Sequence, residues 1–406
     1  MILDLLKYSV SNLWSRKMRS FLTVLSILIG ITAIFALISF GQGINKYMND
    51  FAQEMGTDKV FLMPGGGLAQ APGTSNILFT EDDMEFLKKS NGVDEATGMM
   101  IDSGKIEFKD FKEKYPYVIG LSTESSEKRL VEEMFGGIQI IEGRALKKGD
   151  ALKATLGYSY TIPDKMFKKA ISVGDKIEIN DVEAEVIGFY EEIGNPGDDS
   201  NVYLSSEGFE EIFDTDEFEY IYLRVAAGQD PSEVAERIKE KFRKRRGQKE
   251  GEEDFTVQTF EDMMATFANM INILNGILVM IALISLVVAA VNITNTMYTS
   301  VLERTKEIGI MKSIGSRNEQ ILRIFVIESG ILGLIGGVLG VLLGYGIAKI
   351  GQAIARAAGL SFLSPYFPLW LTIGCLLFAF LVGTLAGILP AIQASKQKPV
   401  ESLRYE

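Results

Sequence analysis

Long apolar runs interrupt the polar background of this chain at four places. The first spans Phe21 to Phe40, the second lies within Ile271–Thr299, the third runs from about Ile324 to Ala348, and the fourth lies within Trp370–Ala394. Each run reaches the roughly 20 residues that a helix needs to cross a bilayer. Only the third contains a charge, at Glu328. The pattern therefore predicts four membrane-spanning helices.

The segment between the first and second runs has the composition of a soluble domain. Its strand-like runs are Lys59–Met63, Tyr117–Leu121, Lys176–Ile179, Glu183–Phe189, Asn201–Leu204 and Tyr220–Val225. Helical patterns alternate with them at Thr80–Lys89, Asp164–Ala170, Ser206–Phe213 and Pro231–Arg246. This alternation predicts a mixed α/β domain, and its length of about 220 residues suggests two subdomains.

Basic residues beside the spans predict which side each connection occupies. They gather before the first span (Lys7, Arg16, Lys17, Arg19), between the second and third (Arg304, Lys306, Lys312, Arg317, Arg323) and in the tail (Lys396, Lys398, Arg404). Short connections rich in Lys and Arg stay in the cytoplasm. We therefore expect a multi-pass protein of the cell membrane with both termini cytoplasmic and the α/β domain outside.

The expected organisation follows from these patterns. The chain divides into a cytoplasmic amphipathic helix (1–19), span one (20–44), an extracytoplasmic α/β domain (45–268), span two (269–300), a cytoplasmic helix (301–318), span three (319–348), a short extracytoplasmic loop (349–368), span four (369–394) and a cytoplasmic tail (395–406). The fold class is an α-helical membrane domain with the α/β domain inserted between spans one and two.

Composition excludes several kinds of chemistry. The chain has no histidine and one cysteine, Cys375, so it offers no Ser-His or Cys-His dyad and no Cys-rich metal site. We expect no catalytic, metal or cofactor-binding residues. Between Lys46 and Asp262 there are 27 Lys and Arg against 46 Asp and Glu, a net charge of −19, which argues against nucleic acid as a partner. Within that segment the basic run Lys241–Arg246 is read as a solvated helix end, or alternatively as a patch for an acidic partner.

Glycine spacing in the last two spans indicates close helix packing. Gly336, Gly340 and Gly344 are four residues apart in the third span, as are Gly383 and Gly387 in the fourth. Small residues at this interval let helix backbones approach closely in lipid. We predict that these helices pack on each other or on a partner span, although glycine is also simply frequent in membrane helices.

The stretch after the second span predicts an amphipathic helix. It would align Ile310 with Ile314 and place Ile308 and Met311 beside them. Arg304, Lys306, Glu307 and Lys312 would cover much of the remaining surface. Such a helix can insert an apolar ridge into a groove of a cytosolic partner; a juxtamembrane loop is the alternative. For Glu328, a structural role in a helix contact is favoured over a proton relay.

Four motifs resemble the MacB/LolC/FtsX family of ABC transporter permeases. The first motif, Asn12–Thr23, precedes the first span, and the second, Glu303–Ser316, follows the second span. The third is Glu328-Ser-Gly with Gly336, Gly337 and Gly340 in the third span. The fourth is Pro390–Ser395 at the end of the fourth span, together with the final Pro399–Glu406. The second motif is similar to the family's cytoplasmic coupling helix. The resemblance implies ATPase-coupling roles for Glu303, Arg304, Lys306, Glu307, Ile308, Gly309, Ile310, Met311, Lys312, Ile314 and Gly315.

The resemblance also implies partners and a mechanism. Because no Gly-x-x-x-x-Gly-Lys-Ser/Thr motif occurs, ATP and Mg²⁺ would bind a separate cytosolic ABC ATPase in two copies. Two permease chains, expected as a homodimer, would transmit ATPase closure to the outer domain, where an adaptor or substrate protein could bind. Membrane lipids are expected around the spans, and nucleic acid is not expected as a partner. Alternatives are an FtsX-type regulator of an extracellular enzyme and an ATPase-independent membrane-anchored sensor or hydrolase.

Overall fold

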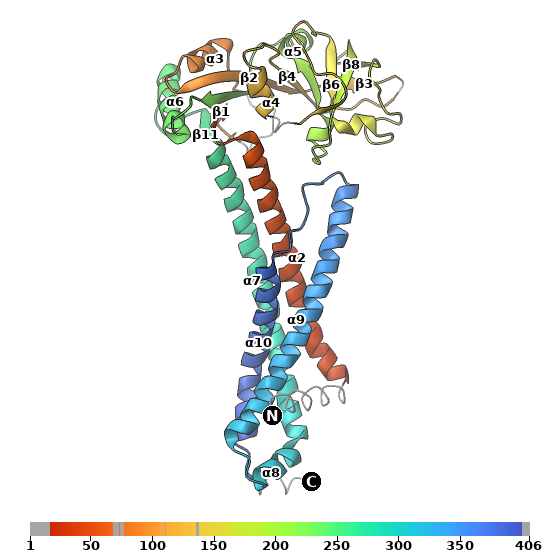
Figure 1. The fold of residues 1–406 in the computed structure, drawn as a ribbon, viewed down its shortest axis with the longest axis vertical. Helices are drawn as coiled ribbons and strands as arrows, with labels where there is room; N and C mark the ends of the chain where they lie inside the picture. The colour runs from red at the N-terminus through yellow and green to blue at the C-terminus, as the bar shows by residue number, and fades with distance from the viewer. Residues whose placement is uncertain (1–16, 68–72, 74–76, 110, 135–137, 400–406) are drawn as a thin grey trace. The chain divides into compact units, whose positions relative to one another are not determined.

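The chain folds into two compact units in the computed structural model (Figure 1), which describes residues 17–67, 73, 77–109, 111–134 and 138–399. A membrane unit comprises Met1–Asn45, Met270–Ile354 and Leu363–Glu406. An α/β unit comprises Lys46–Asn269 and Ala355–Phe362. The amphipathic helix expected at 1–19 falls largely outside the described residues, as does the end of the predicted tail.

Long helices form the membrane unit, and they include the predicted spans. These helices are α2 (Lys17–Met55), α7 (Phe260–Glu303), α9 (Asn318–Ala357) and α10 (Leu369–Ser395), and all four are long and apolar enough to cross a membrane. A short helix, α8 (Thr305–Ser313), lies between α7 and α9. The long helices lie side by side around a shared apolar core that includes Ile27, Ile293 and Phe325. The four spans predicted from the apolar runs are thus confirmed as candidate membrane helices.

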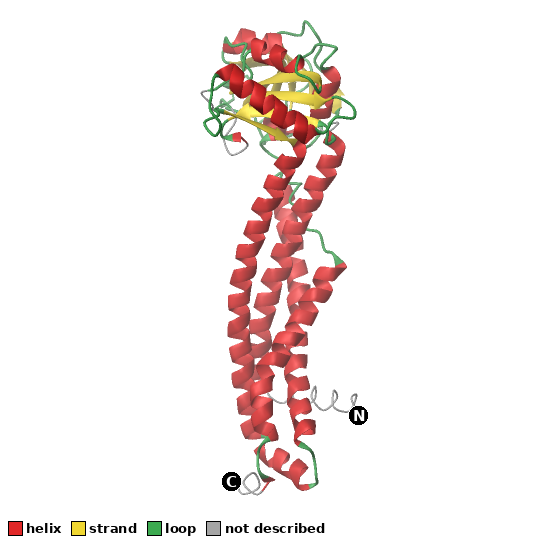
Figure 2. Ribbon diagram, turned by 90° about the vertical axis from the view of Figure 1, so that its left-hand side faces the viewer, coloured by secondary structure: helices red, strands yellow, loops and turns green. Residues whose placement is uncertain are grey.

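One sheet of eleven strands forms the centre of the α/β unit (Figure 2). Its strands are β1 (Lys59–Pro64), β2 (Val93–Ser103), β3 (Ile106–Glu107), β4 (Tyr117–Leu121), β5 (Ile140–Gly143), β6 (Lys153–Leu156), β7 (Lys176–Ile179), β8 (Val182–Tyr190), β9 (Val202–Ser205), β10 (Tyr220–Val225) and β11 (Phe255–Thr259). They are ordered β11-β1-β10-β2-β4-β9-β6-β8-β7-β3, with β5 paired to β8. The two subdomains expected from length therefore share a continuous hydrogen-bonded layer.

Helices cover one face of this sheet. They are α3 (Glu81–Lys88), α5 (Ser206–Phe213) and α6 (Pro231–Arg246), which bury apolar residues such as Leu87, Phe209 and Phe242 in the largest core of the unit. A further helix, α4 (Lys128–Met134), contributes Val131 and Met134 to a different apolar cluster that also contains Tyr203 of β9. The sheet consequently buries apolar side chains on both of its faces.

The helix predicted at Asp164–Ala170 is wrong. These residues form turns in which the Asp164 amide donates to the Phe167 carbonyl at 2.9 Å. Asp164 has a φ of 63°, the left-handed conformation, which no residue within a right-handed helix can adopt. Phe167 and Ile171 are nevertheless buried in the core, so the apolar spacing reflects burial rather than a helix.

Candidate functional site

The segment predicted to dock on a cytosolic partner is a separate short helix. The α7 helix ends at Glu303, Arg304 leaves the helical conformation with φ −108° and ψ 15°, and α8 follows from Thr305 to Ser313. The helix ends in a Schellman motif, because the Gly315 amide donates to the Lys312 carbonyl and the Ser316 amide to the Met311 carbonyl, each at 3.0 Å. Gly315 has a φ of 96°, which glycine adopts without strain.

The α8 helix has an inner and an outer face. Ile308 and Gly309 are buried within the membrane unit, and Met311 is half-buried against the same core. Ile310 and Ile314, by contrast, are 50% and 79% exposed. The anchors expected from the sequence therefore divide: Met311 packs inward, and Ile310 and Ile314 form an exposed apolar pair.

A buried arginine ties this helix to the neighbouring spans. Arg304 donates from Nη1 to Glu328 Oε2 of α9 at 3.0 Å and from Nε to Glu307 Oε2 of α8 at 3.1 Å. Its guanidinium also lies 5.5 Å from the centre of the Phe325 ring. Glu328, for which we predicted a structural role in a helix contact, is one half of a buried ion pair. The sequence analysis missed this pairing, because nothing in the motif matches two charges 24 residues apart.

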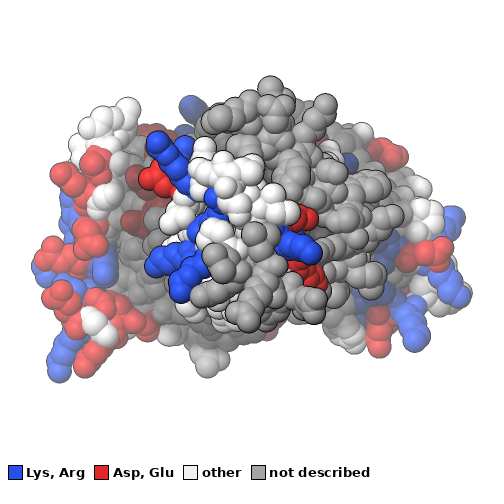
Figure 3. Space-filling model, turned by 90° about the horizontal axis from the view of Figure 1, so that it is seen from below, with Lys and Arg blue, Asp and Glu red and all other residues white. Residues whose placement is uncertain are grey.

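A basic surface surrounds the exposed pair. Lys306, Arg317, Arg323, Lys396 and Lys398 are exposed around α8 and the ends of α9 and α10. Lys312 instead donates to the Gln397 carbonyl at 2.6 Å, which fixes α8 to the end of α10. Figure 3 looks onto this end of the membrane unit and shows Lys and Arg side chains gathered there. The site thus combines a small apolar ridge with a mainly basic surround, which also contains the exposed carboxylates of Glu307 and Glu319.

The glycines of the third span face the first span. A Cβ placed at Gly336 would lie 2.8 Å from Ile27 Cβ, and one at Gly340 would lie 2.8 Å from Ile31 Cβ, both on α2. At Gly344 it would lie 3.0 Å from the backbone oxygen of Thr32. We predicted that the third and fourth spans would pack on each other or on a partner span, and the partner of these three glycines is the first span, α2. The absence of side chains lets the two helix backbones approach closely.

The glycines of the fourth span do face the third. A Cβ at Gly383 would lie 2.5 Å from the backbone oxygen of Ser329, and Gly387 lies against the Ser329 side chain. Gly330, Gly333 and Gly337 of α9 meet this surface, and the sequence analysis did not predict a packing role for any of them. Their spacing of three and four residues was the available signal. The α9 helix therefore presents one small-residue face to α2 and another to α10.

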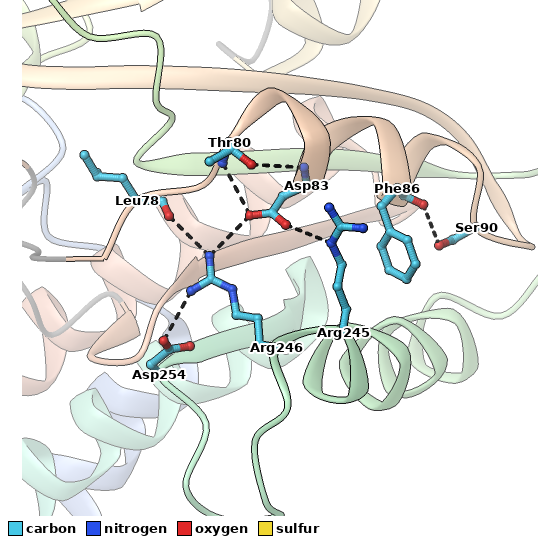
Figure 4. Close-up of polar contacts among 8 residues, drawn as sticks. All are labelled: Leu78, Thr80, Asp83, Phe86, Ser90, Arg245, Arg246 and Asp254. Atoms are coloured by element: carbon cyan, nitrogen blue, oxygen red, sulfur yellow. Dashed lines mark hydrogen bonds and ion pairs between the residues drawn. The ribbon is translucent and has the colours of Figure 1, made fainter.

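The basic run at the end of α6 is largely held within the α/β unit (Figure 4). Arg245 Nε lies 3.1 Å from Asp83 Oδ1, and Arg246 Nη2 lies 3.3 Å from Asp83 Oδ2. Arg246 also pairs with Asp254 at 3.2 Å. Asp83 and Thr80 form the capping box of α3, so the two arginines clamp the end of α6 onto the start of α3.

Within the described part of the chain, no group of three or more His, Cys, Asp or Glu side chains could hold a metal ion.

Comparisons with known proteins identify the family. Residues 20–241 match the MacB-like periplasmic core domain, and residues 279–399 match the FtsX-like permease C-terminal domain. The chain is 33% identical to the uncharacterized ABC transporter permease MJ1507 of Methanocaldococcus jannaschii, over 99% of this chain and 98% of that one. It is 30% identical to the uncharacterized ABC transporter permease YknZ of Bacillus subtilis, over the full length of both.

A third relative is longer than this chain. The macrolide export ATP-binding/permease protein MacB of Bdellovibrio bacteriovorus is 29% identical over all of this chain but only 62% of its own length. The two domain matches, the four candidate spans and the full-length relatives agree. This chain is a multi-pass membrane protein that belongs to the MacB/FtsX family of ABC transporter permeases.

Proposed function

We propose that this permease couples ATP hydrolysis in a separate cytosolic ABC ATPase to a conformational change of its α/β unit. The observation that carries the proposal is the exposed Ile310–Ile314 pair on a helix otherwise anchored inside the membrane unit. Contact between apolar side chains and water is unfavourable, so a partner that covers them gains free energy of binding. A groove on the ATPase would cover this pair, while ATP and Mg²⁺ would bind the ATPase itself.

The route of transmission starts at Arg304. This residue joins α8 to α9 through Glu307 and Glu328, and it follows directly on the last residue of α7. A force on α8 would therefore reach α7 and α9 without passing through a flexible loop. The α7 helix continues without a break to Phe260, which belongs to the α/β unit, so its displacement would move residues in both units.

The proposal includes an orientation and an assembly. The basic surface around α8 would face the cytoplasm with both termini, and the acidic α/β unit would lie outside. Two permease chains, as a homodimer, would meet two ATPase subunits. In support, α7 exposes a long apolar surface that includes Ile273, Met280 and Ile284, which lipid or a second chain would cover. An adaptor or substrate protein would bind the α/β unit.

The test is binding and activity of the ATPase with variants of the exposed pair. Permease in nanodiscs would be mixed with each candidate ABC ATPase from the same genome, and pull-down and ATP hydrolysis would be measured. Ile310→Asp places an unpaired carboxylate in the proposed groove at a cost of several kcal/mol, so binding should weaken by at least about 100-fold. Ile310→Val keeps an apolar contact and serves as the matched control.

Charge at the rim should matter little. Lys306→Ala removes one exposed cation and should cost about 1 kcal/mol or less. Full pull-down and full ATPase stimulation by Ile310→Asp would show that α8 is not the docking element. If the ATPase neither binds the wild-type permease nor changes its rate of ATP hydrolysis, the ATPase-independent sensor would be favoured instead.

A further inference from the structure

The sheet of the α/β unit has a second apolar face, opposite α3, α5 and α6. Side chains alternate along each strand, so β1 directs Val60 and Leu62 into the main core and Phe61 and Met63 to the other face. On β10, Tyr220 and Tyr222 alternate in the same way with Ile221 and Leu223. The second face is rich in aromatic and methionine side chains, which also include Met99 and Tyr203, and the aliphatic Ile119 packs among them.

This second face borders a cavity of about 420 Å³ that lies entirely within the α/β unit. Tyr47 and Phe51 from the end of α2, Met263 from the start of α7 and Met134 from α4 complete its walls. Packed protein interiors have few voids larger than a water molecule. The cavity instead falls within the roughly 300–1,000 Å³ that is typical of pockets for small molecules.

Besides the tyrosine hydroxyls, two polar side chains interrupt the apolar lining. Asn201 is only 5% exposed, and its Oδ1 accepts no hydrogen bond from any described residue. Asp198 also lines the cavity, and its Oδ2 accepts a hydrogen bond from Asn195 Nδ2 at 2.8 Å. Burial raises the pKa of the Asp198 carboxyl above its usual value because it disfavours the charged form, a cost that a cationic ligand would offset. A buried acceptor without a donor is costly, so a ligand that supplies hydrogen-bond donors would remove that cost.

The charge of the lining residues favours a positively charged ligand over a negatively charged one. The residues that line the cavity, all in the described part of the chain, include Asp198 but no Lys or Arg. Aromatic rings attract cations through their negative faces, and the rings of Phe61, Tyr203 and Tyr222 are among the walls. An anion such as a fatty-acid carboxylate would meet the Asp198 charge in a segment whose net charge is already −19.

We propose that this cavity binds a small amphipathic molecule with an apolar body and a protonated amine. The amine donates to the Asp198 carboxylate and to Asn201 Oδ1. The apolar body packs against the aromatic and methionine side chains of β1, β2 and β10. This binding needs neither ATP nor the ATPase, so its test is independent of the coupling proposed for α8.

The experiment uses three probes that share a naphthalene body. Full-length protein in phosphatidylcholine nanodiscs would be titrated by equilibrium dialysis with 1-naphthylmethylamine, 1-naphthalenemethanol and 1-naphthaleneacetate at pH 7, and binding to empty nanodiscs subtracted. The amine should bind at least about tenfold more tightly than the carboxylate, with the alcohol between them. Asp198→Asn should weaken the amine about tenfold and leave the alcohol within twofold.

Two further variants locate the site. Asp94→Asn removes an exposed carboxylate that does not line the cavity and should change nothing, whereas Ile101→Trp fills the cavity and should weaken amine and alcohol alike. Equal affinities for amine and carboxylate, or an Asp198→Asn variant with unchanged amine binding, would overturn the proposal. Tighter binding of dodecanoate than of dodecylamine would also overturn it, in favour of a lipid-chain site. Asp198→Asn is nearly isosteric, so the test remains decisive if Ile101→Trp does not fold.

Discussion

Replacement of one glycine should loosen the membrane unit by a predictable amount. The Cβ of Gly383→Ala would lie 2.5 Å from the Ser329 oxygen and 2.9 Å from Gly333 Cα, both backbone atoms of α9. Backbone cannot rotate away as a side chain can, so α9 and α10 must separate. Ordinary contact begins near 3.4 Å, which makes the required separation about 0.9 Å.

The cost follows from that separation. A gap of 0.5–1 Å removes roughly a quarter to a half of the dispersion energy of each contact across the interface, and overpacked sites typically lose about 1–3 kcal/mol. For a unit of this size the loss corresponds to a fall of about 3–10 °C in the unfolding temperature. Gly346→Ala in α9 is the control, because its Cβ would meet nothing within 4 Å. Both variants exchange glycine for alanine within a helix, so the difference between them reports packing alone.

The chain contains its own reporter for this measurement. Cys375 is its one cysteine, lies on α10 and is only 5% exposed. A thiol-reactive fluorogenic dye added during a temperature ramp in detergent will label it when α10 separates from the unit. We expect Cys375 of Gly383→Ala to be labelled at a temperature several degrees below that of the wild type. Gly346→Ala should be labelled at the same temperature as the wild type. Equal labelling temperatures for the two variants would refute the close α9–α10 packing.

Three other predictions follow from the ion pairs and the proposed orientation. Arg304→Met leaves Glu328 buried without its partner and should cost about 3–5 kcal/mol, whereas Arg304→Met combined with Glu328→Leu should recover part of that loss in the same labelling assay. Hydrogen bonds from the neighbouring Arg144 hold the pKa of the Asp150 carboxyl well below its usual value, so its stabilisation is present above about pH 4 and is lost as the pH falls further. Asp150→Asn should therefore lower the free energy of unfolding of the α/β unit by about 1–2 kcal/mol at pH 7 and leave it unchanged at strongly acidic pH. The change would be measured as a shift in the thermal midpoint by circular dichroism. In a cysteine-free background, cysteine at Ser206 should react with an impermeant thiol reagent on intact cells and cysteine at Ser316 only after lysis; labelling of Ser316 on intact cells would reverse the orientation.

Residue type predicted the strands that are rich in β-branched and aromatic residues. The strand runs at Tyr117–Leu121 and Tyr220–Val225 match β4 and β10, because such residues favour strands wherever they form short runs. The long central strand β2 was missed. It begins with acidic residues and contains Gly98, which lies against the Phe218 ring where a Cβ could not fit. The packing that requires this glycine comes from a residue 120 positions away, so no local pattern could reveal it.

The candidate site was predictable in composition but not in contacts. Helical spacing aligned Ile310 with Ile314, yet it could not tell which of the neighbouring apolar residues turn inward, because that depends on where the membrane unit lies. Glycine spacing likewise indicated close packing without naming the partner. The Gly340 face meets α2 because residues at intervals of four in α9 form a continuous groove, and only the three-dimensional packing determines which helix occupies it.

The contact between α9 and α2 also has a consequence for how the protein is made. Thr32 of α2 donates to the Gly340 carbonyl at 3.1 Å, and the two residues lie 308 positions apart. At about 5–20 residues per second, the ribosome needs roughly 15–60 s to produce the second after the first. During that interval the α/β unit must be synthesised while α2 lies in lipid without its glycine-lined neighbour. A nascent chain stalled before α9 would leave this surface of α2 uncovered, which gives membrane quality control a specific feature by which to recognise incomplete permeases.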